Sequence, residues 1–438
     1  MKVLKFGGTS VGSAQRMKEL TTLVVDGSQK LVVLSAMSGT TNALVEISDY
    51  LYKQNSTGAN ERINSLEKKY FDTIDELYSK ADYNNKATET VKSVFDYIRS
   101  FTKGAFSSVE EKIILAQGEI ISTTMVNLYF NELGIRSVLL PALEFMRTDE
   151  KGEPDSVYIQ EKIALSLAKH KDAKIYITQG YICRNFKDEI DNLQRGGSDF
   201  SATLIGAAIK AEEIEIWTDI DGMHNNDPRF VENTRPVANL HFKEAAELAY
   251  FGAKILHPTC VLPAKLAGIP IRLLNTMEPK AKGTLISNVC TPHKIEAVAA
   301  KDGITAIKIT SSRMLLAYGF LCEVFEIFKK YQTPIDMITT SEVGISVTID
   351  NNKYLSEILD ELKAFGNIKC YEDMVIICVV GDLPHDNVGF QAKVVGALRD
   401  VPISMISYGG SSCNISFLVK AEDKKCALNA LSDNLFKN

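Results

Sequence analysis

The sequence predicts an α/β fold in which a mostly parallel sheet lies between helices, followed by two smaller units that mix strands and helices. Short apolar runs alternate with longer segments of helical apolar spacing from the N-terminus to about residue 290. From about residue 300 the chain carries an internal repeat. At 438 residues the chain is also too long for one ordinary core, so several domains are expected.

The first elements of the chain alternate in type. Val3–Phe6 is a short strand candidate, and Ser13–Val25 follows it with helical spacing. Leu31–Leu34 is a continuous apolar run, as expected for a strand buried on both faces, and another helix begins at about Asn42. Residues 59–102 are charged and have the spacing of a helical excursion. The later candidates are the strands Lys174–Thr178, Glu213–Thr218 and Ile269–Leu274 and the helices Ile113–Leu133, Phe200–Lys210 and Phe242–Lys254.

The C-terminal repeat has matching features in matching order. Gly319-Phe320 opens one helix-like stretch, and Gly389-Phe390 opens another 70 residues later. The strand candidates Ile345–Ile349 and Ile415–Val419 are separated by the same 70 residues. With a polar turn before each of these strands, the pattern predicts two related βαββαβ units.

Composition favours a soluble globular protein and argues against a nucleic-acid binder. Hydrophobic residues make up 45% of the chain, charged residues 24%, and the net charge is -6, whereas nucleic-acid binding requires a basic face. The eight cysteines form no Cys-x-x-Cys pair and no zinc-like cluster with histidine, which predicts reduced thiols and no metal site. The N-terminus does not have the pattern of a signal peptide, and no apolar run approaches the ~20 residues that span a bilayer, so a cytoplasmic location is expected.

The segment Lys5-Phe6-Gly7-Gly8-Thr9-Ser10 is the first candidate site. Paired glycines between a strand and a helix let the backbone approach a ligand closely, and the helix N-terminus offers N–H groups to a phosphate. Lys5, at the end of the strand, could reach the same phosphate. A tight turn beside a surface lysine fits the local composition equally well, and the segment is neither a Walker A loop nor a dinucleotide fingerprint.

Two further turns of small residues are candidates. Residues 35–42, Ser-Ala-Met-Ser-Gly-Thr-Thr-Asn, follow a buried strand, where α/β proteins bind ligands. The turn Arg195-Gly-Gly-Ser-Asp199 places a cation and an anion on either side of a glycine pair. Arg195 suits a substrate carboxylate, because guanidinium binds carboxylates in a planar fork. Asp199 suits the orientation of lysines around a transferred phosphoryl group, and the alternative is a helix cap with Arg195 as its solvated partner.

The remaining candidates follow a later strand and a later helix. Trp217–Gly222 ends a strand with hydroxyl and carboxylate groups, and Asp227-Pro228-Arg229 comes soon after. Such groups suit the ribose and phosphates of a nucleotide, although a plain turn has the same composition. Lys254, in Phe251-Gly-Ala-Lys-Ile-Leu-His-Pro258, is a candidate second phosphate-binding cation.

Together these segments resemble the aspartate kinase family. The Lys-Phe-Gly-Gly-Thr-Ser start, the Arg-Gly-Gly-Ser-Asp turn, Trp-Thr-Asp, Asp-Pro-Arg and Phe-Gly-Ala-Lys-Ile-Leu-His-Pro occur in the order of that family. The resemblance covers essentially the whole chain, because the repeat looks like paired ACT domains. It implies an amino-acid kinase domain over residues 1–290, a first ACT domain over 300–368 and a second over 369–438. The family tends to interleave its ACT units, which implies that the C-terminal end of the chain completes the first one.

The resemblance also implies roles for single residues. Lys5, Gly7 and Gly8 match the catalytic start that cradles phosphate, and Asp199 matches the catalytic aspartate. The positions that match the binding site for the amino-acid substrate are Ser35, Thr41, Glu119, Arg195 and Ser198. The further nucleotide positions are Thr218, Asp219, His224, Arg229 and Lys254, with His224 standing where the family often has a tyrosine.

The implied reaction transfers the γ-phosphoryl group of Mg-ATP to the β-carboxylate of L-aspartate and gives 4-phospho-L-aspartate. This is the first step of lysine, threonine and methionine biosynthesis, and Mg²⁺ is carried by the nucleotide. Because two anionic reactants meet, catalysis is expected from charge neutralisation and positioning by Lys5, Lys254 and the glycine N–H groups. His257 is expected to be structural, because an acceptor carboxylate that is already ionised needs no general base.

Two other functions remain open. One is a related kinase of the same fold that phosphorylates another acceptor, and the tandem repeat and the Arg195–Asp199 turn count against it. The other is a non-catalytic amino-acid sensor, and the intact set of Lys5, Asp199, Glu119 and Lys254 counts against that.

The first repeat is the predicted effector site. Asp336 in the first repeat aligns with Ser404 in the second, and a ligand's ammonium group prefers the aspartate, although a turn-capping role is the alternative. Residues 338–343, Ile-Thr-Thr-Ser-Glu-Val, look like those of lysine-inhibited members of the family, so L-lysine is the expected effector and threonine the alternative. The family implies a homodimer or homotetramer formed through the ACT domains. The other expected effector contacts are Met314, Gly319, Phe320, Leu321, Ser341, Glu342 and Val343.

Overall fold

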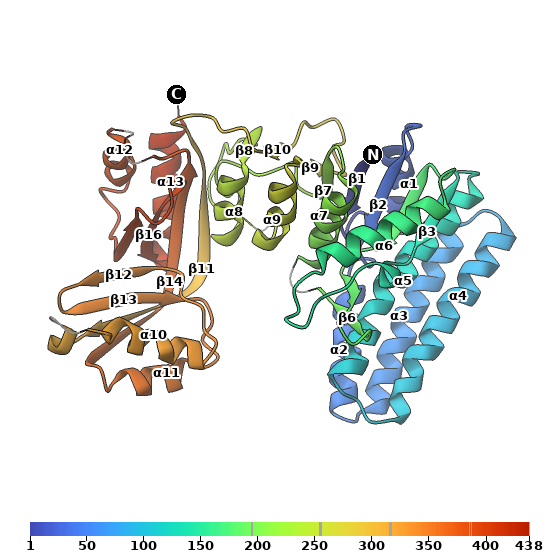
Figure 1. The fold of residues 1–438 in the computed structure, drawn as a ribbon, viewed down its shortest axis with the longest axis horizontal. Coiled ribbons are helices and arrows are strands. Elements are labelled where there is room, and N and C mark those ends of the chain that lie inside the picture. The colour runs from blue at the N-terminus through green and yellow to red at the C-terminus, as the bar shows by residue number, and fades with distance from the viewer. Residues whose placement is uncertain (194–195, 254–255, 315–317, 385, 387, 438) are drawn as a thin grey trace. The chain divides into compact units, whose positions relative to one another are not determined.

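The computed structural model describes residues 1–193, 196–253, 256–314, 318–384, 386 and 388–437. The chain divides into two compact units, each assembled from two stretches of sequence (Figure 1). Unit 1 comprises Met1–Met223 and Ile255–Asn288, and unit 2 comprises His224–Lys254 and Val289–Asn438.

Unit 1 is built on a sheet whose strands are mostly parallel, which confirms the predicted fold class. Its strands follow the order β3-β4-β2-β1-β7-β9-β10, and β10 is antiparallel to β9. β2 is buried at every residue, as its continuous apolar run predicts. The strands are β1 Lys2–Phe6, β2 Lys30–Leu34, β3 Ser137–Leu140, β4 Ile175–Gln179, β7 Ile214–Thr218, β9 Ile271–Asn275 and β10 Thr284–Ser287, with a separate hairpin of β5 Ile182–Arg184 and β6 Ile190–Asn192.

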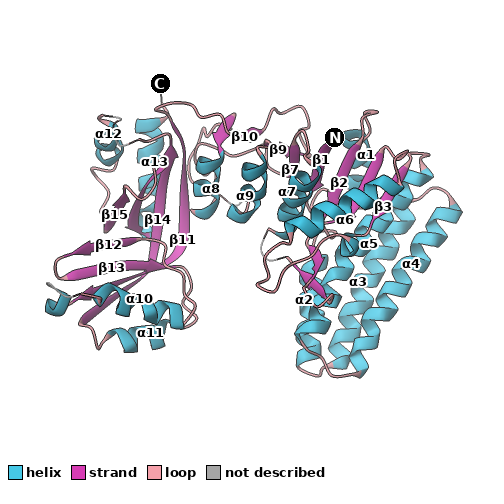
Figure 2. Ribbon diagram, in the orientation of Figure 1, coloured by secondary structure: helices cyan, strands magenta, loops and turns pink. Residues whose placement is uncertain are grey.

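The helices of unit 1 include the predicted excursion, which consists of α3 and α4. α3 packs against α2 and α4, and α4 packs against α5 (Figure 2). α5 is long and apolar enough to cross a membrane by length and composition alone, but 72% of its most apolar window is buried inside the protein, as in the core helix of a globular domain. The helices are α1 Ala14–Val24, α2 Thr40–Tyr52, α3 Ser56–Leu77, α4 Ala81–Ser100, α5 Ser108–Glu132, α6 Ser156–Lys169, α7 Gly197–Ile209 and α9 Pro258–Ala267, with the short 3-10 helices η1 Phe101–Lys103 and η2 Ala142–Glu144.

Unit 2 contains a six-stranded antiparallel sheet in the order β12-β13-β11-β14-β16-β15. The strands of the unit are β8 Asn239–His241, β11 Ile295–Thr310, β12 Ile338–Ser341, β13 Gly344–Ile349, β14 Asn367–Gly381, β15 Met405–Tyr408 and β16 Asn414–Lys420. Its helices are α8 Phe242–Tyr250, α10 Phe320–Lys330, α11 Leu355–Leu362, α12 Phe390–Ala397 and α13 Lys424–Leu435, with the 3-10 helices η3 Ser312–Met314 and η4 Ala421–Asp423.

The two repeats share this sheet, and the second repeat takes one of its strands from the segment that precedes the first. The C-terminal half of β11 pairs with β13 and with the start of β14, so the first repeat forms a βαββαβ unit from a contiguous segment. The end of β14 opens the second repeat and pairs with β16. Among the described residues no strand follows α13, and the N-terminal half of β11, Ile295 to Lys301, lies beside β14 as the fourth strand of the second repeat. Val298 of this half packs in the core cluster that holds α12 and α13.

This exchange runs opposite to the expectation that the C-terminal end completes the first unit. Leu428 and Leu431 of α13 pack in the core of the second repeat, whereas the core of the first repeat is made by α10, α11 and their strands. A βαββαβ unit needs four strands to cover its two helices, and the described residues of the second repeat supply three, namely the end of β14, β15 and β16. The missing strand therefore comes from the segment that precedes the first repeat.

The predicted helix over residues 242–254 is shorter than expected. α8 ends at Tyr250, and Gly252 follows with φ +112. A β-carbon on Gly252 would lie 2.2 Å from the carbonyl oxygen of Ala300, so only glycine allows this close approach to β11. The left-handed turn ends the helix before Lys254, which lies outside the described residues.

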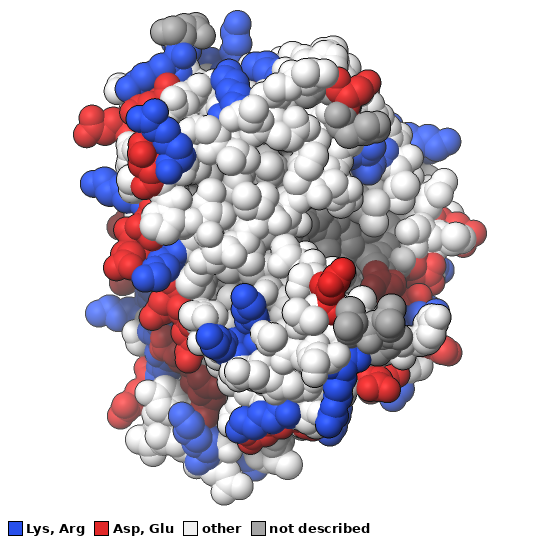
Figure 3. Space-filling model, turned by 90° about the vertical axis from the view of Figure 1, so that its left-hand side faces the viewer, with Lys and Arg blue, Asp and Glu red and all other residues white. Residues whose placement is uncertain are grey.

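The charged residues show no single-sign patch on the face drawn in Figure 3. Lys and Arg side chains alternate there with Asp and Glu around a broad uncharged area.

Candidate active site

The candidate site lies at the edge of the unit 1 sheet where the parallel strands end. Three backbone hydrogen bonds connect the turns that leave neighbouring strands. Gly7 N–H donates to Trp217 O at 3.3 Å, Ser35 N–H donates to Phe6 O at 3.2 Å, and Gly180 N–H donates to Leu34 O at 2.9 Å. Because the carboxyl ends of parallel strands share one edge, turns that are far apart in the sequence meet here.

The central feature of this edge is an ion pair between Lys5 and Asp199. The Lys5 Nζ lies 2.7 Å from Asp199 Oδ1, and the two side chains are only 9% and 14% exposed. Asp199 stands in the first turn of α7, and the N-cap of that helix is Gly196 with φ +77. Asp199 is therefore not the helix cap that the alternative interpretation suggested, since its carboxylate reaches across to β1.

The predicted Gly7-Gly8 cradle is packed tightly against the second turn. A β-carbon on Gly8 would lie 2.9 Å from the carbonyl oxygen of Ala36, and Gly8 O accepts the Ser38 N–H at 3.1 Å. A β-carbon on Gly7 would lie 3.5 Å from Lys5 Nζ. These two glycines keep the backbone close to the lysine, as a phosphate cradle requires.

Beside this ion pair lies a cavity of about 530 Å³, which we call the Glu119 pocket. Four of the five residues predicted for the substrate line it, namely Ser35, Thr41, Glu119 and Ser198, together with Gly8 of the predicted phosphate cradle. The fifth, Arg195, lies outside the described residues. The N-termini of α2 and α7 both open on this pocket, and helix N-termini favour anionic ligands. The other lining residues are Ala36, Met37, Ser38, Gly39, Asn42, Tyr181, Leu193, Gly196 and Gly197.

Glu119 is the buried charge of this pocket. It projects from α5 and is 3% exposed. Its Oε1 accepts the Ala36 N–H at 3.1 Å, whereas Oε2 is buried with no hydrogen-bond partner among the described residues. Burial raises the pKa of Glu119 to about 7, against the smaller opposing effect of the Ala36 bond. A carboxylate oxygen that lacks a partner in a pocket is suited to an ammonium group of a ligand.

Sequence reasoning missed several residues that support this pocket. Ser122 Oγ donates to Ser35 O at 2.8 Å. Tyr181 adopts φ +67, which is unusual for a tyrosine, and a β-carbon on Gly197 would lie 2.4 Å from its ring. Cys260 Sγ lies 3.6 Å from Gly196 O, and burial raises the pKa of this thiol to about 12. No local pattern marks these residues in the sequence.

The predicted nucleotide residues of unit 1 follow β7. Thr218 O accepts both the Thr276 N–H and the Thr276 hydroxyl at 2.8 Å. Ser10 Oγ of the first turn donates to Thr276 Oγ1 at 3.3 Å, which links the Gly7-Gly8 turn to the ends of β7 and β9. Asp219, the next residue, is exposed. His257, expected to be structural, is the N-cap of α9, and its side chain accepts the Thr259 N–H.

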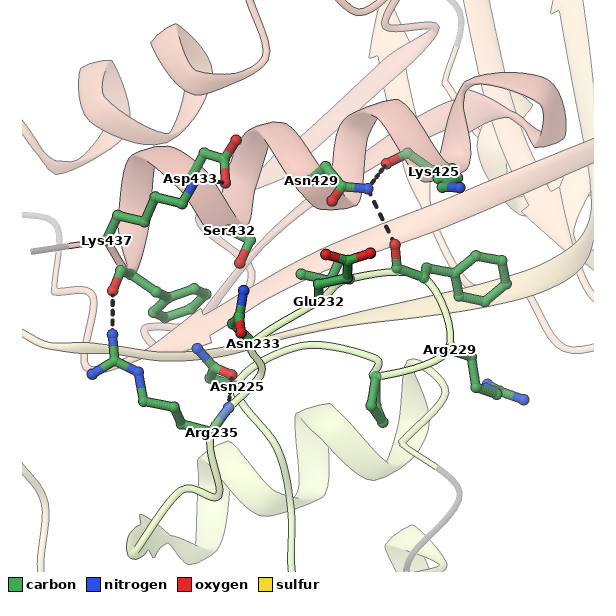
Figure 4. Close-up of a pocket in the computed structure, with 14 residues that line it drawn as sticks. Asn225, Arg229, Glu232, Asn233, Arg235, Lys425, Asn429, Ser432, Asp433 and Lys437 are labelled. Atoms are coloured by element: carbon green, nitrogen blue, oxygen red, sulfur yellow. Dashed lines mark hydrogen bonds and ion pairs between the residues drawn. The ribbon is translucent and has the colours of Figure 1, made fainter.

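The remaining predicted nucleotide residues belong to unit 2. His224 Nδ1 lies 2.9 Å from Thr234 Oγ1. Arg229 makes a two-pronged ion pair with Asp227, with Nη2–Oδ2 at 2.6 Å and Nε–Oδ1 at 2.9 Å. Arg229 lies at one end of a polar cavity of about 470 Å³ between residues 225–235 and α13, and Arg235 lies at the other end (Figure 4).

The predicted effector residues fall into two groups at opposite ends of the β12–β13 hairpin. Near its turn, Ser311 N–H donates to Val343 O at 2.8 Å, which brings η3 with Met314 toward Ser341, Glu342 and Val343. Gly319, with φ +85, is the N-cap of α10, followed by the buried Phe320 and by Leu321, which is 39% exposed.

Asp336 lies at the other end of the hairpin, where its N–H donates to Thr348 O at 2.9 Å. Its carboxylate is 1% exposed and is held by Lys301 Nζ at 2.7 Å and by the Tyr250 hydroxyl at 2.7 Å. Lys301 also contacts Asp350 at 2.9 Å. Burial alone would lower the pKa of Lys301, but its bonds to Asp336 and Asp350 outweigh burial and raise it above the ordinary value.

The fold and the site define the class of protein. Residues 1–275 match the Amino acid kinase family, and residues 377–435 match an ACT domain. Lysine-sensitive aspartokinase 3 of Escherichia coli is 32% identical to this chain, and the alignment covers 99% of each protein. Aspartokinase 1, chloroplastic, of Arabidopsis thaliana is also 32% identical over 100% of this chain and 80% of that protein.

Solved structures agree over the whole length. The structure of E. coli aspartokinase III in complex with aspartate and ADP has a TM-score of 0.85 and 32% identity and covers 100% of both chains. The structure of the same protein in complex with lysine and aspartate has a TM-score of 0.83. The chain belongs to the aspartokinase family, as its motifs predict.

Proposed function

We propose that this protein transfers the γ-phosphoryl group of ATP to the β-carboxylate of L-aspartate and that an amino-acid end product, L-lysine, inhibits it. The observation that carries the proposal is the buried Lys5–Asp199 ion pair beside the Glu119 pocket. The pair offers a cation for phosphate, and the pocket offers a carboxylate and two helix N-termini for an amino acid that carries charges of both signs.

Lys5 and Asp199 act together on the phosphoryl group. Asp199 fixes the ammonium of Lys5 at the end of β1, so that the lysine meets the phosphate with little reorganisation. The Gly7 and Gly8 backbone lies close to the same point and suits the nucleotide phosphates. Mg²⁺, bound to the nucleotide, supplies further neutralisation of the phosphate charge. The residues at this edge of the sheet therefore suit a nucleotide whose phosphates lie at the ends of the strands.

The acceptor binds in the Glu119 pocket. The free Oε2 of Glu119 accepts the ammonium group of aspartate, and Arg195 binds its α-carboxylate. Ser35, Thr41 and Ser198 orient the acceptor from the pocket wall. Thr218, Asp219, His224, Arg229 and Lys254 complete the nucleotide site in this proposal.

In this proposal the effector binds where two copies of the protein form a dimer. β12 is an edge strand of the six-stranded sheet, and Ile338 on it and Val343 after it are each 43% exposed. Antiparallel pairing of β12 with β12 of a second copy would place Asp336 of one copy beside the β12–β13 turn of the other. This pairing joins the two groups of effector residues that lie apart in one chain, which supports a homodimer, or a homotetramer built from it.

Lys301 occupies the carboxylate that an effector's ammonium group would use. A free lysine therefore has to displace the Lys301 side chain from Asp336 before it binds there. Since Tyr250 of α8 also donates to Asp336, this exchange changes a contact of the segment that precedes the predicted nucleotide residue Lys254. In this proposal the effector thereby acts on the nucleotide site. We also propose that the protein is cytoplasmic.

The test is ATP-dependent formation of aspartyl hydroxamate from L-aspartate and hydroxylamine, with and without L-lysine. Product that decreases with added lysine supports both parts of the proposal, and product that decreases only with threonine replaces the effector. Product from another carboxylate but not from aspartate makes the protein a related kinase. No product from any acceptor leaves an amino-acid sensor as the function.

A further inference from the structure

The helical excursion formed by α3 and α4 contributes none of the residues assigned to the proposed reaction. α3 nevertheless contacts the turn that forms one wall of the Glu119 pocket. This turn, residues 38–41, depends on partners outside itself. Gly39 is the N-cap of α2 with φ +79, and no side chain caps the helix there. The Ser38 N–H is bound by Gly8 O, and the Ser38 carbonyl needs a donor from elsewhere.

Two consecutive residues of α3 supply the missing contacts. Lys69 Nζ donates to Ser38 O at 2.6 Å. The Tyr70 hydroxyl lies 2.9 Å from Thr40 Oγ1, and both of these groups are buried. The backbone of Ser38 is thus held at its N–H by the Gly8 turn and at its carbonyl by Lys69. A shift of Lys69 would move the pocket wall and would reach the phosphate cradle through Gly8.

The charge of Lys69 is not cancelled by an acid. Among the described residues, no carboxylate lies within ion-pair distance of it, in contrast to Arg62 of the same helix, which pairs with Glu46. A β-carbon on Gly39 would lie 3.9 Å from Lys69 Nζ, so the ammonium group stands directly behind the pocket lining. Partial burial and the nearby Arg62 lower the pKa of Lys69. This cation adds positive potential to a pocket proposed to hold an anionic acceptor.

We propose that Lys69 is a positioning residue for the acceptor: it fixes the Ser38–Thr41 turn through the Ser38 carbonyl and adds positive charge behind the Glu119 pocket. The inference rests on the proposed function, because it takes the acceptor to be aspartate bound in that pocket. It assigns the helical excursion a part in substrate binding, which its sequence pattern does not indicate.

Three substitutions separate the donor from the charge. Lys69→Met removes both, Lys69→Gln keeps an N–H donor without the charge, and Lys69→Arg keeps both. Lys68→Met is the matched control, because Lys68 is the preceding residue of the same helix, is exposed, and loses the same net charge. The KM for aspartate is expected to rise about tenfold in Lys69→Met and less in Lys69→Gln, and to return toward the parent in Lys69→Arg. kcat is expected to change less than threefold.

The measurement is the hydroxamate assay with varied aspartate, at low and at high ionic strength, on variants whose thermal unfolding is cooperative. Added salt should raise the KM of the parent more than that of Lys69→Met. An equal KM for Lys69→Met, Lys68→Met and the parent overturns the inference. If Lys69→Met does not fold, the order of KM in Lys69→Gln and Lys69→Arg decides instead. A parent that makes no product from aspartate contradicts the proposed function itself and is thereby distinguished from a failure of Lys69.

Discussion

The ammonium group of Lys301 lies 2.7 Å from the carboxylate of Asp336, the residue that we assign to the effector. Lys301 also lies 4.5 Å from the ring centre of Tyr250, whose hydroxyl binds the same carboxylate oxygen. A lysine of the protein itself therefore occupies this acidic position.

Lys301→Met should make the protein more sensitive to free lysine. The internal competitor is lost, and the lysine concentration for half inhibition should fall about tenfold. The buried Asp336 loses a partner at the same time, so the free energy of unfolding should decrease by about 1–3 kcal/mol and recover on addition of lysine. Inhibition curves and thermal unfolding with and without lysine measure both effects. Lys308→Met, an exposed lysine on the same strand, is the control, and an equal response of the two variants would contradict the competition.

Asp336→Ala tests the effector site from the other side. Removal of the carboxylate should abolish inhibition by lysine at concentrations that inhibit the parent, while kcat without effector changes little. Asp350→Ala is the matched comparison, because Asp350 contacts Lys301 but is 37% exposed and is not assigned to the effector. If Asp336→Ala is inhibited as strongly as the parent, the effector binds elsewhere.

Lys5→Ala should lower turnover far more than it weakens aspartate binding. The lost ammonium group is one that neutralises charge at the transferred phosphoryl group, and removal of such a group typically costs about 10²–10³ in kcat. The KM for aspartate should stay within about threefold, because Lys5 does not line the Glu119 pocket. Steady-state kinetics with both substrates varied give these values. Near-normal turnover would remove Lys5 from the mechanism.

Glu119 should give the binding of aspartate a pH dependence. Its pKa is raised to about 7 by burial, so the free protein gains the carboxylate as pH rises through that value. Because the ammonium group of aspartate binds the ionised form, kcat/KM for aspartate should increase with pH below about 7 and level off above it. Glu119→Gln should remove this step and raise the KM about tenfold or more. A Gln variant that keeps the same pH profile would assign the step to another group.

Gly8→Ala should impair the site by displacing a turn. The added β-carbon would meet the Ala36 carbonyl oxygen at 2.9 Å, so the phosphate cradle and the Glu119 pocket must move apart. We expect the KM values for ATP and aspartate to rise together, with a destabilisation of about 1–3 kcal/mol. Gly104→Ala, where a β-carbon meets nothing within 4 Å and φ is -128, is the control and should leave both unchanged.

The sequence predicts the strand-end part of the site well, because its residues lie in recognisable turns. Lys5 and Asp199 are almost two hundred positions apart, yet each stands where a strand ends or a helix begins, and such turns meet at one edge of a parallel sheet. The sequence also predicts the relation between the two repeats, since Gly319 and Gly389 adopt the same φ of +85 before their helices.

Other features have no local pattern. Glu119 lies in a helix buried nearly all round, so only the family resemblance distinguishes it. Lys69 looks like any lysine of a charged helix, and its contact with Ser38 depends on how α3 packs. The length of β11 is hidden too, because Lys301-Asp302-Gly303 resembles a turn, whereas the strand continues through it with shifts in register.

The strand that passes between the repeats limits how this protein can be divided. A gene fragment for the second repeat alone, starting at β14, would lack the strand that pairs with β14 and the apolar side chains of that strand that pack in its core, such as Val298. A soluble fragment has to begin before Ile295 and therefore includes the first repeat as well. The two similar halves are therefore not equivalent, because the first is built from one contiguous segment, whereas the second keeps its fourth strand only when the segment before the first is present.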